Sequence, residues 1–340
     1  MSASVLFRFD AIRLFALAAI LNALLAFPLL YQTYKHFSSE LTPMDVRSYM
    51  VMVEGGPEAI HAPFRYRVLT PLIVKVMDVL PGYDIIIDMP GDAASRKIFF
   101  HFMLINFVFT VAVSGLLFVY LRARVGDIAA WAGSLFYLFG FVTVTANYIP
   151  MTDAACHLAI LAAILSYDRN RPLAFLVVSV IGVFAKETVL LVVAAWIAVH
   201  AIGDWKRLRW LALLIPGALA YMALVRLYPA PAVQAYNDPM HVLRGILRIV
   251  DPATYSRTFL FHTGIGYLPL VAAFAAWIWL RVAKGVRIPL NRGLWVFFGL
   301  LWLGVAMDIG NNAGRLAFMA FPAVALFQAR VLEAIFRPST

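Results

Sequence analysis

Long apolar stretches alternate with short polar ones along this chain, and their lengths predict helices that cross a membrane. A spanning helix needs about 20 apolar residues, or fewer where it is buried or spans only half of the bilayer. The stretch 172–202 is too long for a single span at about 1.5 Å per residue, and its only charges lie in its middle. We therefore divide it into two short helices that meet near Lys186. The predicted spans are about 11–31, 98–121, 128–148, 154–167, the two halves of 172–202, 210–227, 266–280, 294–307 and 316–327, or about ten in all.

Two polar intervals are much longer than the rest, at about 32–97 and 228–265. In the first, apolar residues recur at helical spacing over 69–80, which indicates ordered structure rather than disorder. We predict that residues 67–80 form a helix lying on the membrane surface. No repeat or separate soluble domain interrupts the pattern. The sequence thus predicts an all-α protein, with residues 1–340 forming one polytopic transmembrane domain.

Composition supports this class. The chain has 340 residues, 63% of them apolar and 14% charged, whereas soluble domains are about 45–50% apolar. Its net charge of +10 comes from short basic clusters between the apolar runs, a pattern that indicates membrane orientation rather than a nucleic-acid partner. The single cysteine, Cys156, excludes an intramolecular disulfide, and no metal-ligand spacing or nucleotide-binding motif is present. We predict no metal and no cofactor.

The basic clusters also predict which way the helices run. When every predicted span is counted, the short basic loops fall on one side, and the positive-inside rule places that side and both termini in the cytoplasm. The two long loops then face outward. The clusters are Arg8 with Arg13, Arg122 with Arg124, Arg169 with Arg171, Lys206 with Arg207 and Arg209, Arg281 with Lys284, Arg287 and Arg292, and Arg330 with Arg337.

Polar residues beside the apolar helix ends gather on the predicted outer side. Each ionisable group at membrane depth costs about 2.5–3.5 kcal/mol on insertion scales, so such groups are rare unless paired or functional. Their convergence predicts one site, with cations to hold an anionic lipid phosphate and carboxylates to deprotonate a hydroxyl. The residues are Asp45, Arg65, Arg67, Asp153, Lys186, Glu187, Asp308 and Arg315.

Most of these residues also have a structural interpretation. Lys186 and Glu187 are neighbours that would form a local ion pair reaching the interface. Asp153 and Asp45 each precede an apolar run and fit helix caps. Juxtamembrane arginines such as Arg65 commonly bind anionic headgroups. Arg315 is harder to explain in this way, because an arginine at the start of a helix gains nothing from the helix dipole.

Several short motifs resemble bacterial multi-spanning membrane proteins related to the GT-C glycosyltransferases. They are Asp45-x-x-x-Tyr49, Pro63-Phe64-Arg65-Tyr66-Arg67-Val68-Leu69-Thr70-Pro71, Thr152-Asp153, Lys186-Glu187, and Gly314-Arg315 with Pro322. The resemblance covers most of the chain through scattered matches. The chain departs from better-known members in lacking a paired acidic motif in the first loop and a large carboxy-terminal periplasmic domain.

The resemblance implies a glycosyltransferase of the bacterial inner membrane. We predict an inverting reaction, because one carboxylate acts on the acceptor and no second one is needed as a nucleophile. A polyprenyl-phosphate sugar lipid would be the donor, and a glycan or lipid acceptor would receive the sugar at the extracytoplasmic face. Asp45 would be the catalytic base, and Lys186, Arg315 and Arg65 or Arg67 would hold the donor phosphate. The expected substrate-binding or supporting residues are Tyr49, Tyr66, Asp153, Glu187, Asp308, Asn311 and Asn312.

Two other functions remain open. Two short helices meeting at Lys186 and Glu187 resemble the broken helices of transporters, so the chain is also compatible with a transporter or flippase for a lipid-linked or small anionic substrate. The absence of an inverted repeat and the position of the charges at one face weigh against transport. A noncatalytic subunit of a polysaccharide assembly machine is the third candidate.

The topology yields a testable prediction. With about ten spans and cytoplasmic termini, Asn311 lies outside the cell and residues 204–209 lie inside. A cysteine placed at Asn311 should react with a membrane-impermeant thiol reagent in intact cells. Labelling that appears only after permeabilisation would overturn the predicted orientation.

Overall fold

Helices are the only regular elements in the part of the chain that the computed structural model describes. That part comprises residues 3–36, 44–60, 63–80, 93–147, 149–229, 265–306 and 313–336. The all-α prediction is therefore confirmed. Two helical segments, Ala94–Arg122 and Trp205–Leu227, are long and apolar enough to cross a membrane. Length and composition alone thus give weak support for membrane association, and the number of spans stays a prediction.

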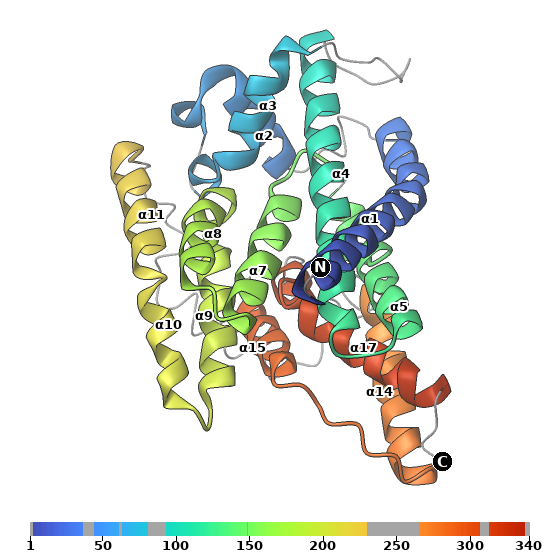
Figure 1. Cartoon of the computed structure of the whole chain (residues 1–340). Helices are drawn as coiled ribbons and strands as arrows, with labels where there is room; N and C mark the ends of the chain where they lie inside the picture. Colours follow the sequence, from blue (N-terminus) through green and yellow to red (C-terminus); the bar gives the residue numbers. More distant parts are fainter. Residues whose placement is uncertain are drawn as a thin grey trace.

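The helices pack side by side, with a smaller helical cap at one end of the bundle (Figure 1). The bundle contains α1 (Ala3–His36), α4 (Ala93–Arg122), α5 (Asp127–Leu138), α6 (Phe141–Ala146), α7 (Asp153–Asp168), α8 (Pro172–Ala185), α9 (Thr188–Ala201), η5 (Trp205–Leu208), α10 (Arg209–Ala212), α11 (Ile215–Leu227), α14 (Ile265–Ala283), α15 (Gly293–Ala306), α16 (Ala313–Phe318) and α17 (Phe321–Phe336). The cap contains α2 (Met44–Gly55), η2 (Pro57–Ala59), η3 (Phe64–Tyr66), α3 (Leu69–Val76) and η4 (Met77–Val79).

The helix predicted in the first long polar interval is present in the cap. Residues 69–79 are helical, as the apolar spacing indicated. Thr70, Pro71 and Val74 of α3 are buried, whereas Leu72 and Val76 are exposed. The helix packs against α2, α4 and α8, so its inner face belongs to the protein core. Its position at a membrane surface stays a prediction.

The predicted break in 172–202 is confirmed. α8 ends at Ala185 and α9 begins at Thr188, and Lys186 between them has an extended backbone (φ −168°, ψ 131°). Pro172 at the start of α8 fits its place, because a proline in the first helical turn costs no hydrogen bond.

Three predicted spans are wrong in their continuity: 128–148, 316–327 and 210–227, the last of which is divided by a turn between α10 and α11. The stretch 128–148 forms α5 and α6, which are separated at Phe139 and Gly140, with Gly140 in an extended conformation. The stretch 316–327 belongs to α16 and α17. Pro322 accounts for the second break, because proline has no N–H to continue the hydrogen-bond ladder of the preceding helix.

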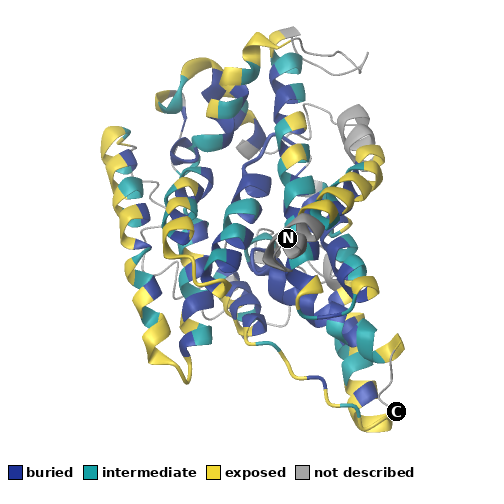
Figure 2. Ribbon diagram, viewed as in Figure 1, coloured by how far each residue is buried: buried dark blue, intermediate teal, exposed yellow. Residues whose placement is uncertain are grey.

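α7 is the most enclosed of the described helices, and Figure 2 shows it as largely buried in the middle of the bundle. It packs against α4, α8 and α9. Small side chains permit the close approach: a Cβ added at Gly182 of α8 would lie only 2.8 Å from Cβ of Ala159. Small residues at helix contacts are typical of bundles in lipid.

The peripheral helices α1, α11 and α14 expose large apolar side chains (Figure 2). Leu24 of α1 is 67% exposed, Leu219 of α11 is 58% exposed and Val271 of α14 is 52% exposed. Contiguous apolar surface of this kind is unfavourable in water and marks a surface that contacts protein or membrane. That these helices face lipid stays a prediction.

Two glycines of α15 provide a test of this packing. A Cβ at Gly293 would lie 2.6 Å from Trp196 and 2.7 Å from Ala323, whereas nothing lies within 4 Å of a Cβ at Gly299. Gly293→Ala should lower the free energy of unfolding by about 1–3 kcal/mol through overpacking. Gly299→Ala should raise it by about 0.5–1 kcal/mol, because alanine loses less backbone entropy in a helix. Thermal unfolding in detergent measures both, and equal shifts would contradict the packing.

Candidate functional site

Five charged side chains meet at the cap end of the bundle, at Arg67, Asp153, Lys186, Glu187 and Arg315, and we call them the charge cluster. They come from the cap after η3, from the start of α7, from the α8–α9 junction and from α16. The structure thus brings together five of the residues that the sequence nominated, from segments far apart in the chain.

Asp153 lies at the centre of the cluster and is fully buried. Its Oδ1 accepts hydrogen bonds from Lys186 Nζ at 2.9 Å and from Arg315 Nε at 3.0 Å. Arg315 Nη2 also donates to Oδ2. A buried carboxylate without such partners would carry a desolvation cost of several kcal/mol. Asp153 is therefore the shared anion of two cations and not a helix cap, since the N-cap position belongs to Thr152.

Glu187 pairs with Arg67, so the alternative interpretation of Lys186 and Glu187 as a local ion pair does not hold. Arg67 Nε donates to Glu187 Oε2 at 2.9 Å, and Arg67 Nη2 donates to Oε1 at 2.5 Å, which is a two-point contact. The extended backbone at Lys186 explains the difference, because it interrupts the helix and lets adjacent side chains reach different partners.

Tyr49 of α2 completes this side of the cluster. Arg67 Nη1 donates to its hydroxyl at 3.2 Å, and its ring packs edge-on against Phe64. Burial raises the pKa of Tyr49, although the charge of Arg67 acts in the opposite direction, so the phenol stays neutral. Burial would lower the pKa of Arg67, but Tyr49 and Glu187 outweigh it and raise that pKa well above its ordinary value.

Arg65 and Tyr66 connect the cap to α11 and to the residues that follow it. Arg65 Nε donates to the carbonyl oxygen of Ile60 at 2.6 Å, and its Nη1 donates to that of Pro229 at 2.7 Å. The ring of Tyr66 contacts that of Tyr221 edge-on. Because the guanidinium of Arg65 binds backbone carbonyls, Arg67 is the arginine of this pair that belongs to the charge cluster.

Four nominated residues cannot be placed by their side chains. Asp45 is the second residue of α2, but its side chain lies outside the described residues, as do Asp308, Asn311 and Asn312. Position 45 precedes Tyr49 by four residues on the same helix, and positions four apart share a helix face. The Tyr49 contact with Arg67 therefore directs this face of α2 toward the charge cluster.

One buried polar group escaped the sequence analysis. The hydroxyl of Tyr137 lies 3.1 Å from His157 Nδ1, and Asn147 Nδ2 donates to that hydroxyl at 3.0 Å. Asn147 Nδ2 also lies 3.3 Å from His157 Nδ1, so the three side chains form one buried polar group. The available signal was the spacing, because His157 follows Asp153 by four residues and shares its face of α7.

The charge cluster is suited to binding an anion. Its three cations and two carboxylates leave one net positive charge in a largely buried setting. Arg315 and Glu187 are its more accessible members, with side chains 15% and 26% exposed, against 9% for Lys186 and Arg67. Arg315 is therefore the most exposed of the three cations.

Comparison of the chain with protein-family models, curated proteins and solved structures finds no match. The resemblance to GT-C glycosyltransferases stays a prediction, and function is inferred from the geometry of the site.

Removing the shared carboxylate tests the cluster. Asp153→Asn should lower the free energy of unfolding by about 3–5 kcal/mol, because it leaves two buried cations without their anion. Thermal or denaturant unfolding in detergent measures the loss. The double variant Asp153→Asn with Lys186→Met should show a smaller loss of unfolding free energy than Asp153→Asn alone, because one of the two unpaired cations is then absent.

The matched control is Asp204→Asn, which breaks an ion pair with Arg207 whose side chains are about half exposed. Its cost should stay below about 1 kcal/mol. If Asp153→Asn were equally mild, or the double variant no better than the single one, Asp153 would not hold the two cations together.

Proposed function

We propose that this protein is an inverting membrane glycosyltransferase that moves a sugar from a polyprenyl-phosphate lipid to a glycan or lipid acceptor. The observation that supports it best is the buried charge cluster with a net positive charge, assembled at one end of an apolar bundle. On this proposal that end faces the extracytoplasmic side of the bacterial cell membrane, and both termini lie in the cytoplasm.

The cations act on the leaving group. As the bond between the sugar carbon and the phosphate oxygen breaks, negative charge grows on the departing lipid phosphate. Arg315 is the accessible cation of the cluster and contacts that phosphate, while Lys186 adds positive charge from behind. Fixed cations need no reorganisation during the reaction, so they lower the barrier more than mobile water does.

Asp45 acts as the general base. Asp153 and Glu187 are each held by cations, and a carboxylate in that situation is a poor proton acceptor. Asp45 lies on the face of α2 that carries Tyr49 toward the cluster. The acceptor hydroxyl attacks the sugar carbon, its proton passes to Asp45, and the lipid phosphate leaves on the opposite side. A single displacement of this kind inverts the configuration at the sugar carbon.

The apolar surface fits a lipid donor. The exposed side chains of α1, α11 and α14 offer hydrocarbon contact to membrane lipids and to the polyprenyl tail. The tail then needs no enclosed pocket, and only the phosphate and the sugar require polar recognition.

A transporter or flippase for an anionic substrate is the second candidate, favoured by one observation. α8 and α9 form a helix that is interrupted at Lys186, with a cation at the break, as in the broken helices of transporters. Transport predicts movement of the intact lipid between leaflets, whereas transfer predicts a new glycosidic product. Proteoliposomes loaded with the sugar lipid distinguish the two.

The proposal is tested with purified protein, a polyprenyl-phosphate sugar and candidate acceptors. Asp45→Asn should abolish product formation and release of lipid phosphate, while the protein stays folded and still binds the donor lipid. Asp78→Asn is the matched control, because Asp78 is an acid of the same loop that pairs with Lys97 outside the cluster. It should retain activity.

Arg315→Ala should weaken donor use by about 2.7–4 kcal/mol of transition-state stabilisation, which is about 10²–10³ in rate. Full activity in Asp45→Asn would remove Asp45 from the mechanism and leave Glu187 and Asp153 as candidates. Lipid translocation without any glycosidic product would favour the transporter.

A further inference from the structure

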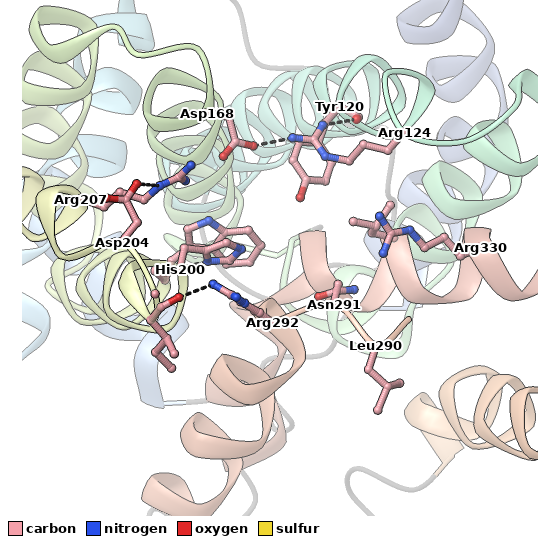
Figure 3. A pocket seen from close by; sticks show the side chains of 14 residues that line it. Tyr120, Arg124, Asp168, His200, Asp204, Arg207, Leu290, Asn291, Arg292 and Arg330 are labelled. Carbon is pink, nitrogen blue, oxygen red and sulfur yellow. Dashed lines mark hydrogen bonds and ion pairs between the residues drawn. The ribbon is translucent and has the colours of Figure 1, made fainter. Parts of the chain in front are cut away.

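A second charged site lies at the other end of the bundle. It is a pocket of about 610 Å³ where the ends of α4, α7 and α9 meet η5, the segment before α15, and α17 (Figure 3). Four arginines line it, at Arg124, Arg207, Arg292 and Arg330. The sequence analysis treated these residues only as parts of separate basic loops.

This pocket is separate from the charge cluster. Asp153 is the first residue of α7 and Asp168, which lines the pocket, is the last. At 1.5 Å per residue, the 16 residues of α7 hold the two sites about 22 Å apart. α9 gives the same separation independently, because it begins next to Glu187 and carries His200 of the pocket in its last turn. The basic loops predict that the pocket faces the cytoplasm.

The charges of the pocket do not cancel. Arg124 pairs with Asp168 at 2.6 Å, and Arg207 pairs with Asp204 at 3.1 Å. The other two arginines have no carboxylate in the pocket to neutralise them, so its lining keeps two positive charges with His200 neutral.

Two guanidinium groups retain donors for a ligand. Arg292 Nη1 donates to the carbonyl oxygen of Ile202 at 2.6 Å, a contact that fixes the side chain and leaves other N–H groups available. Arg330 makes no hydrogen bond or ion pair with any residue in the described part of the chain and is only partly buried. Figure 3 shows Arg124, Arg292 and Arg330 approaching the opening from three different sides.

We propose that this pocket binds a phosphate-bearing molecule with at least two negative charges. Every Lys or Arg in the lining is an arginine, and the planar guanidinium binds phosphate oxygens through paired hydrogen bonds. The volume lies within the range of about 300–1,000 Å³ that is typical of small-molecule sites, so a diphosphate with an attached group fits. A second anion site of this kind goes beyond the proposed sugar transfer, which uses only the charge cluster.

Pyrophosphate is the probe for the test. Binding to the full-length protein in nanodiscs of phosphatidylcholine is measured by isothermal titration calorimetry. Arg330→Gln should weaken pyrophosphate binding at least tenfold, and Arg292→Gln should act in the same direction. The matched control is Arg209→Gln, which removes the same charge from an exposed arginine at the same end but outside the pocket, and it should bind as the wild type does.

A further experiment distinguishes a lipid headgroup from a soluble phosphate as the natural ligand. Phosphatidic acid added to the nanodiscs should compete with pyrophosphate through Arg330 if the natural ligand is a lipid headgroup, whereas undiminished binding indicates a soluble phosphate. The pyrophosphate measurement contains no sugar donor and no acceptor, so its outcome is independent of the proposed transferase activity. Absence of binding by the wild type, or equal losses in Arg209→Gln and Arg330→Gln, would overturn the proposal.

Discussion

The buried carboxylate of Asp153 is the constraint on which the cap end of this protein depends. It accepts hydrogen bonds from Lys186, 33 residues away, and from Arg315, 162 residues away, and thereby joins α7 to the α8–α9 junction and to α16. None of these three charges is tolerable alone in a dry interior. The interaction thus makes the positions of three chain segments interdependent.

The interrupted helix is the backbone counterpart of this ion pair. A continuous helix through Lys186 would present adjacent residues in fixed directions about 100° apart. The extended residue between α8 and α9 instead allows Lys186 to reach Asp153 and Glu187 to reach Arg67. The second contact fastens the cap, with α2 and Tyr49, over the first. One break in a helix therefore organises both halves of the charge cluster.

The two ends of α7 have different electrostatic designs. At the cap end, cations and carboxylates are matched closely and are mostly buried, which suits a preorganised site. At the other end the ion pairs are more exposed and are outnumbered by arginines around an open pocket. The first arrangement favours stabilisation of charge during a reaction, and the second favours reversible capture of an anion from solvent or from the lipid surface. The helices between them hold the two sites apart.

Sequence alone determined the all-α fold and nominated the five residues of the charge cluster. Apolar stretches and helical spacing act locally, so they predicted the all-α fold, the break at Lys186 and the helix in the first long loop. The same local signals missed the interruption at Gly140, because a single glycine in an apolar stretch is compatible with a helix interior as well as with a helix end.

Only the tertiary structure decided which charged side chains pair with each other. Adjacent Lys186 and Glu187 suggested a local pair, yet each binds a residue from another segment, because desolvation favours whichever opposite charge the packing brings within reach. Arg65 and Arg67 flank the same tyrosine, and the sequence does not distinguish their roles. In the structure Arg65 binds backbone carbonyls, whereas Arg67 binds a carboxylate. The arginine pocket, too, gathers residues from helix ends that no spacing rule connects. Sequence periodicity places a residue on a helix face, and only the docking of helices decides which charge that face meets.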